Sequence, residues 1–149
     1  MGNFRNLKVW QRSHALAVTI NRLCSHLPWY ERTDLCSQMR RAATSVPFNI
    51  AEGCGRKSAS GNNEDLLSRP SISSGSLHEL DSEIEYARAV EYIPLADVPY
   101  LVTDVGESRM MLAALSTTLR ERDRHRRRSP RHTVTLSRCN RQLPRLRSG

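Results

Sequence analysis

Apolar residues recur at steps of three and four through most of the chain, which is the spacing of amphipathic α-helices. Apolar and polar residues nowhere alternate strictly over the length of a strand. The pattern therefore predicts an all-α protein, an up-down four-helix bundle with short links. Its four apolar stripes are Val9, Leu16, Ile20, Leu23 and Leu27; Leu35, Met39, Ala42, Val46 and Ile50; Leu66, Ile72, Leu77, Leu80, Ile84, Ala87 and Tyr92; and Leu101, Val105, Leu112, Leu115 and Leu119.

The second predicted helix contains a proline and ends near two glycines. Pro47 removes a backbone donor and crowds the preceding turn, so we expect a kink near residues 43–47. The helix then resumes to Glu52, and Gly53 and Gly55 close it.

The third predicted helix has a weak beginning. The run from Gly53 to Asn63 is rich in Gly, Ser and Asn and predicts a loop, after which Asn63 can cap the helix. Pro70 spoils the first turns, and the stretch around it is poor in helix formers. The periodicity breaks at Pro94, and Asp97 can cap the fourth helix, with Pro99 in its first turn.

Regular periodicity stops after Arg120. Residues 120–149 hold 11 arginines, no lysine, and only Glu121 and Asp123 as acids. Such dense like charge with few apolar residues does not bury enough surface to offset chain entropy. We therefore expect a four-helix bundle over residues 1–119 and a disordered Arg-rich C-terminal tail over residues 120–149.

Charge is distributed unevenly along the chain, whose formal net charge is +8. Residues 1–57 hold nine basic and three acidic groups, whereas residues 58–119 hold three basic and ten acidic groups. The body is therefore polarised, and the net basic character belongs to the tail. Basic and acidic halves of neighbouring subunits could pair head to tail, and such a contact can close into a ring.

Several classes of protein do not fit this sequence. It has no apolar run of about 18 residues and no secretory signal, so we expect a cytoplasmic protein without a membrane span. The cysteines form no CxxC pair and lie at no metal-ligand spacing relative to the histidines, so we expect no metal and no cofactor. These residues are Cys24, Cys36, Cys54 and Cys139, and His14, His26 and His78.

No residue set predicts catalysis. Cys24 and Cys36 fall on or beside apolar stripes, which is typical of small buried groups. We interpret the carboxylate run as the solvated face of the third helix, because alternate positions on a helix do not converge. Without a nucleophile, base and orienting group, we expect no enzyme. The run comprises Glu79, Asp81, Glu83 and Glu85.

Residues 38–56 are the most unusual segment, and two interpretations of them remain open. In the first, small residues permit close helix packing, and Asn49 and Glu52 satisfy groups that the bend at Pro47 frees. In the second, the segment carries a basic patch that binds a phosphate backbone. The candidate contacts are Arg40, Arg41, Arg56 and Lys57, with Lys8, Arg12 and Arg5 contributing from the first helix.

The sequence resembles a bacterial family of four-helix-bundle proteins, first described as products of intervening sequences within 23S rRNA genes. The resemblance covers residues 4 to about 119. The matching residues are Phe4, Leu7, Val9, Trp10, Gln11, Leu27, Pro28, Glu31, Leu35, Gln38, Arg40, Arg41, Ala42, Ser45, Pro47, Asn49, Ile50, Ala51, Glu52, Gly53, Arg56, Gly75, Ser76, Leu77, Glu79 and Leu80.

The resemblance implies a bundle that assembles into a ring, commonly a homopentamer. It also implies similarity to accessory proteins of diversity-generating retroelements, whose basic pentamers bind nucleic acid and a reverse transcriptase. Two features depart from the family. Arg69, Pro70, Ser73 and Ser74 replace bulky apolar residues and an alanine, which should weaken the third helix, and the Arg-rich tail has no counterpart.

The sequence leads to one main hypothesis and one alternative. The main hypothesis is a non-enzymatic homo-oligomer that binds RNA or DNA through a basic face, with Arg40, Arg41, Arg56 and Lys57 as contacts and the tail as a nonspecific anchor. The alternative is an adaptor that holds a protein partner such as a reverse transcriptase.

Overall fold

A computed structural model of the chain describes residues 3–60 and 64–128. These residues form four α-helices, two short 3₁₀ helices and no strand, which confirms the predicted all-α class. The helices are α1 (Lys8–Cys24), α2 (Leu35–Ser60), α3 (Glu64–Ala89) and α4 (Val98–Arg128), with η1 (Phe4–Asn6) and η2 (Trp29–Glu31).

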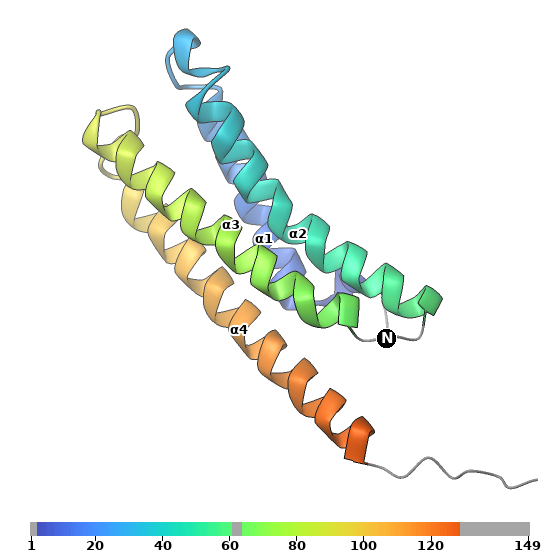
Figure 1. Cartoon of the computed structure of the whole chain (residues 1–149). Coiled ribbons are helices and arrows are strands. Elements are labelled where there is room, and N and C mark those ends of the chain that lie inside the picture. The colour runs from blue at the N-terminus through green and yellow to red at the C-terminus, as the bar shows by residue number, and fades with distance from the viewer. Residues whose placement is uncertain (1–2, 61–63, 129–149) are drawn as a thin grey trace, which may run out of the picture.

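The four helices run alternately up and down around one core (Figure 1). The most extensive contact is between α2 and α3. α1 packs against α2 and α4, and α3 packs against α4. With this topology, the start of α1, the end of α2, the start of α3 and the end of α4 lie at one end of the bundle.

The core consists mostly of the apolar stripes that the periodicity predicts. Ile72, placed on the third stripe, is an exception, because it is 50% exposed. Leu16, Ile20, Met39, Leu77 and Ile84 are almost completely buried, and they come from three helices. A smaller apolar cluster lies at the end of the bundle where α4 finishes. It joins Cys54 of α2 to Leu119 of α4, and Phe4, Leu7 and Leu115 pack against these two.

The predicted end of the second helix is wrong. α2 runs through Pro47 and through Gly53 to Ser60, without a break at either residue. Pro47 is buried in the bundle, and Gly53 and Cys54 are buried beyond it, so packing outweighs the weak helix preference of proline and glycine. Most of the predicted loop is therefore helix, and residues 61–63 lie outside the described residues.

The third helix is also stronger at its start than predicted. α3 begins at Glu64 and continues through Pro70, which stands in its second turn and removes only one intrahelical hydrogen bond. The helix ends at Ala89, before Pro94. Glu91 has a φ of 60°, and the amide of Tyr92 donates to the carbonyl of Ala87 over 2.8 Å, which is a Schellman-type ending.

α4 extends beyond the point where the sequence periodicity stops. The expectation of disorder from Arg120 onward is wrong for the first turns, since α4 reaches Arg128. α4 has 31 residues against 26 in α3, so its last turns project past the start of α3 (Figure 1). Residues 129–149 of the predicted tail lie outside the described residues. Within the described ranges no helix is long and apolar enough to cross a membrane.

Candidate nucleic-acid interface and the polar seam between α2 and α3

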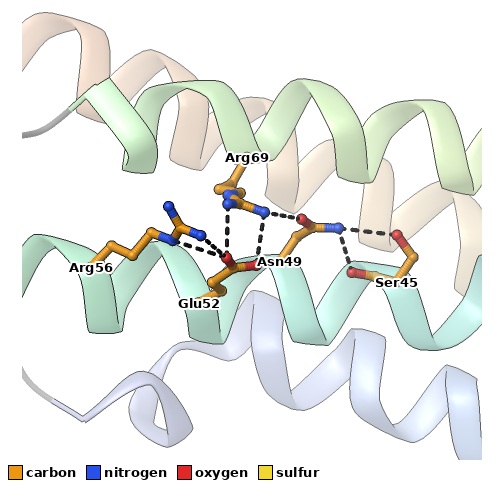
Figure 2. A network of polar contacts seen from close by, with 5 residues as sticks. All are labelled: Ser45, Asn49, Glu52, Arg56 and Arg69. Carbon is orange, nitrogen blue, oxygen red and sulfur yellow. Dashed lines mark hydrogen bonds and ion pairs between the residues drawn. The ribbon is translucent and has the colours of Figure 1, made fainter.

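A chain of polar contacts runs along the seam between α2 and α3 (Figure 2). Arg69 of α3 binds both carboxylate oxygens of Glu52 on α2, over 2.8 and 2.9 Å, and also donates to Asn49 Oδ1 over 3.0 Å. The Arg69 side chain is only 18% exposed. Arg56 donates to the same Glu52 from the solvent side, with Nη2 2.7 Å from Oε1. Glu52 is thus held between two guanidinium groups.

The same seam continues toward the middle of the bundle. Asn49 Nδ2 donates to the Ser45 carbonyl over 2.8 Å and to Ser45 Oγ over 3.0 Å, and Ser76 Oγ of α3 donates to Ser45 Oγ over 2.9 Å. Asn49 and Glu52 therefore join α2 to α3. Pro47 has no N–H to donate to the carbonyl of Ala43, four residues earlier. In these contacts neither the Asn49 nor the Glu52 side chain bonds that carbonyl.

Sequence reasoning missed the role of Arg69, because it treated this residue as a polar intrusion that weakens the third helix. A cation at this position compensates the half-buried Glu52, and burial strengthens the pairing relative to an exposed one. The sequence feature that could have predicted this pair is Glu52, because a carboxylate expected to be buried requires a hydrogen-bond partner.

The structure separates the predicted phosphate contacts on α1 and α2. Arg12 lies 2.8 Å from Asp104 on α4 and also pairs with Glu107, so carboxylates of the same chain compensate its charge. Arg40 is half-buried. Arg41 pairs with Glu79 of α3 over 3.3 Å, although its side chain remains 77% exposed. Arg12 stands one turn from Lys8 on α1, whereas Arg40 and Arg41 lie about four turns from Arg56 on α2.

The other candidates lie at one end. Lys8 is exposed at the first residue of α1, and Arg56 is exposed near the end of α2. Lys57 belongs to α2, but its side chain lies outside the described part of the chain. The small apolar cluster of Leu7, Cys54 and Leu119 holds the start of α1, the end of α2 and the last turns of α4 together. Each of these three residues lies within two positions of a basic residue in the sequence.

The end of α4 adds the largest group of exposed cations to this site. We call the surface formed by Lys8, Arg56 and the arginines of the last α4 turns the basic end. Arg5 in η1 is also exposed there, and its guanidinium lies 4.6 Å from the Phe4 ring centroid. The exposed α4 arginines are Arg120, Arg122, Arg124, Arg126 and Arg128.

The carboxylate run of α3 is the solvent-facing set that its spacing suggested at Glu79 and Glu85, it is partly exposed at Asp81, and it is buried at Glu83. Glu79 pairs with Arg41, Asp81 with Arg109 over 3.4 Å, and Glu85 with Arg88 over 2.8 Å. Glu83 is the exception, because its side chain is buried. Glu83 lies one turn beyond Glu79, on the side of α3 that faces α2, and burial raises its pKa to about 7.

The cysteines have the packing role that the sequence suggested. Cys24 and Cys36 are fully buried, and each thiol donates to the other's carbonyl, over 3.8 and 3.5 Å. Burial, together with neighbouring Cys36, raises the pKa of the Cys24 thiol to about 12, so it stays protonated at neutral pH. Among the described residues no three His, Cys, Asp or Glu side chains converge on a possible metal position.

The described residues form a four-helix bundle in which a line of polar contacts joins α2 to α3. The sequence model of the 23S rRNA-intervening sequence protein family matches residues 5–114, and the chain belongs to this family. This match confirms the resemblance seen in the sequence.

One solved structure and the curated proteins give further comparisons. A protein of unknown function from the S23 ribosomal protein family of Bacteroides thetaiotaomicron has a similar fold, with a TM-score of 0.64 and 22% sequence identity. The match covers 73% of this chain and 95% of that chain. No curated protein is significantly similar to the chain.

Proposed function

We propose that this protein is a non-enzymatic, cytoplasmic homo-oligomer that binds RNA or DNA through the basic end. One observation supports the proposal: α4 continues to Arg128, so five exposed arginines stand at the same end of the bundle as Lys8 and Arg56. The number of subunits that the family resemblance implies, five, is part of the same proposal.

The chemistry of the basic end suits the phosphate backbone. Guanidinium groups bind phosphate oxygens with charge-assisted, paired hydrogen bonds, and they need no particular base. Arg12 contributes less in this proposal, because two carboxylates compensate it. Arg41, Arg56 and Arg126 also pair with carboxylates, but each keeps a side chain that is more than half exposed. The family's name refers to rRNA genes, which makes duplex RNA the first probe to use.

Salt dependence tests the proposal directly. Binding of a labelled RNA duplex is measured by fluorescence anisotropy at low and at moderate salt. Phosphate contacts release counterions, so the affinity should fall steeply with salt. An affinity that does not change with salt would contradict the phosphate mechanism.

A pair of matched variants tests the place of binding. Lys8→Gln with Arg56→Gln removes two positive charges from the basic end. Arg22→Gln with Arg32→Gln removes two exposed charges from the opposite end. We expect only the first pair to weaken binding and to lower the salt slope, by up to about 0.9 for each lost contact with a duplex.

A protein partner is the second candidate, and an exposed apolar stripe favours it. Phe48 is 66% exposed, and it stands seven residues after Arg41 on the same face of α2. Ile72 and Tyr86, also exposed, lie seven residues before and after Glu79 on α3. Since Arg41 and Glu79 pair across the seam, these apolar groups flank it.

The partner that the resemblance implies is a reverse transcriptase. A pulldown from the native host distinguishes the two functions, because a protein partner survives nuclease treatment. Phe48→Ser should release such a partner, whereas variants of the basic end should not.

A further inference from the structure

A polar pocket lies between α3 and α4, on the side of the bundle that adjoins the basic end. It has a volume of about 330 Å³, which is at the lower end of the range for pockets that bind small ligands. Among the residues whose side chains are described, its lining holds two arginines and no aspartate or glutamate. These arginines are Arg109, in the middle part of α4, and Arg120, at the basic end. The described lining of the pocket is therefore positively charged.

The two arginines stand on one face of α4, with small residues between them. They are eleven residues apart, which is about three turns and a rise of about 16 Å. Ala113 and Ser116 stand between them on the same face and also line the pocket. Because both side chains are small, the space between the arginines stays open. The facing wall consists of small residues of α3, which are Pro70, Ser71 and Ser74.

Arg109 is only weakly engaged within the chain. Its Nη1 lies 3.4 Å from Asp81 Oδ2, and 40% of its side chain is exposed. Charge-assisted hydrogen bonds are usually about 2.7–2.9 Å long, and partly exposed ion pairs contribute little to stability. Arg109 therefore keeps donors for another anion. Arg120 is exposed and forms no ion pair with another described residue.

Three serine hydroxyls add neutral donors to the pocket. Ser71, Ser74 and Ser116 line it, and none of their hydroxyls bonds to another described residue. Each hydroxyl can donate one hydrogen bond to an anion, so donors from two helices surround the pocket. A phosphate group has at least three acceptor oxygens that point in different directions, whereas a carboxylate has two in one plane. The arrangement therefore suits a phosphate group better than a carboxylate.

We propose that this cavity, the phosphate pocket, binds a phosphate group between Arg109 and Arg120. The group comes either from the backbone of the RNA or DNA at the basic end or from a small phosphate compound. The first source rests on the proposed function, and it extends the contact surface along α4 from the basic end to Arg109. Arg120 then belongs to both surfaces and makes them continuous.

Matched leucine variants of the full-length protein test the pocket without a change of charge. Ala113→Leu fills the space between the two arginines. Ala114→Leu is its control, because Ala114 is the next exposed residue of α4 and does not line the pocket. Arg109→Gln removes one cation from the pocket, and Arg88→Gln removes a half-exposed arginine of α3 outside it. Circular dichroism checks that each variant is folded.

Two probes distinguish the two sources of the phosphate group. The first is a labelled RNA duplex, measured by anisotropy at low salt, and the second is inorganic phosphate, measured by titration calorimetry without RNA. If the backbone is the source, Ala113→Leu and Arg109→Gln should each lose about tenfold in RNA affinity, while both controls keep it. If a small phosphate compound is the source, the RNA affinities stay equal, and both pocket variants lose the heat of phosphate binding.

Asp81→Asn should act in the opposite direction. It releases Arg109 from its carboxylate, so the affinity for the probe that binds should rise. The proposal is overturned when both pocket variants bind RNA and phosphate as their controls do, or when Ala114→Leu loses as much affinity as Ala113→Leu. A wild type that binds phosphate in the pocket but no RNA would contradict the proposed function and leave the phosphate pocket in place.

Discussion

Arg69 binds Glu52 through two parallel hydrogen bonds of 2.8 and 2.9 Å, and this pair fastens the start of α3 to the end of α2. Both segments were the weakest by helix propensity, since one contains Pro70 and the other Gly53 and Gly55. The bidentate contact and the burial around it explain why both segments are helical.

Removal of the Arg69 guanidinium should destabilise the bundle. Arg69→Met keeps most of the apolar stem but leaves Asn49 Oδ1 and one Glu52 oxygen without their donor. We expect a loss of about 1–2 kcal/mol in the free energy of unfolding, measured with urea.

Arg56→Met is the matched control, because Arg56 pairs with the same carboxylate from an exposed position. Exposed ion pairs contribute little, so the loss should stay below about 0.5 kcal/mol. Equal losses for the two variants would show that burial of Arg69 is not what makes the contact strong.

Most of the fold follows from the sequence, because the spacing of apolar residues determines which helix faces pack. Leu16, Ile20, Leu77 and Ile84 were all predicted on such stripes, and all are buried. The helix ends were less predictable. Local propensity favours a break at Gly53 or Pro70, and only contacts with another helix, such as Arg69 with Glu52, reverse that preference.

The charged surface was harder to predict than the core. Adjacent arginines such as Arg40 and Arg41 suggest a patch, but whether each one is compensated depends on residues far along the chain. Arg12, for example, finds its partners on α4. The sequence likewise gave no reason to separate Glu83 from the exposed carboxylates beside it, since its burial depends on how α3 packs against α2.

The buried Glu83 should make stability depend on pH. Burial and, to a smaller extent, the charge of Glu79 raise its pKa, and Arg41 lowers it, so that the pKa moves from 4.5 to about 7. Glu31 and Asp34 line the same pocket as Glu83. Between these pH values the folded protein holds a proton that the unfolded chain has lost. The contribution of Glu83 to the free energy of unfolding therefore falls as the pH rises from about 4.5 to about 7.

Glu83→Gln should remove this dependence, because the amide cannot ionise. Relative to the wild type, the variant should gain about 1–2 kcal/mol between pH 5 and pH 8, since water in the open pocket screens part of the penalty. Urea unfolding at both pH values, under conditions where both proteins are monomeric, measures the gain. A constant difference between them would contradict the raised pKa.

Gly75 should be replaceable by alanine with a gain in stability. It stands on the exposed face of α3, and a Cβ at this position would meet no atom within 4 Å. Alanine restricts the unfolded chain and favours helix, so the free energy of unfolding should rise by about 0.5–1 kcal/mol. Gly106→Ala in α4 meets equally open space and should act in the same direction. Urea unfolding would reveal a loss, which would contradict this geometry.

The central claim is that the folded basic end, and not arginine content alone, binds nucleic acid. The most direct measurement compares two full-length variants that lose the same charge, by anisotropy of a labelled RNA duplex at moderate salt. One carries Arg122→Gln, Arg124→Gln and Arg128→Gln in α4, and the other carries Arg138→Gln, Arg141→Gln and Arg145→Gln. We expect the first variant to lose about tenfold or more in affinity and the second to lose much less. Equal losses, or a larger loss in the second variant, would contradict the account.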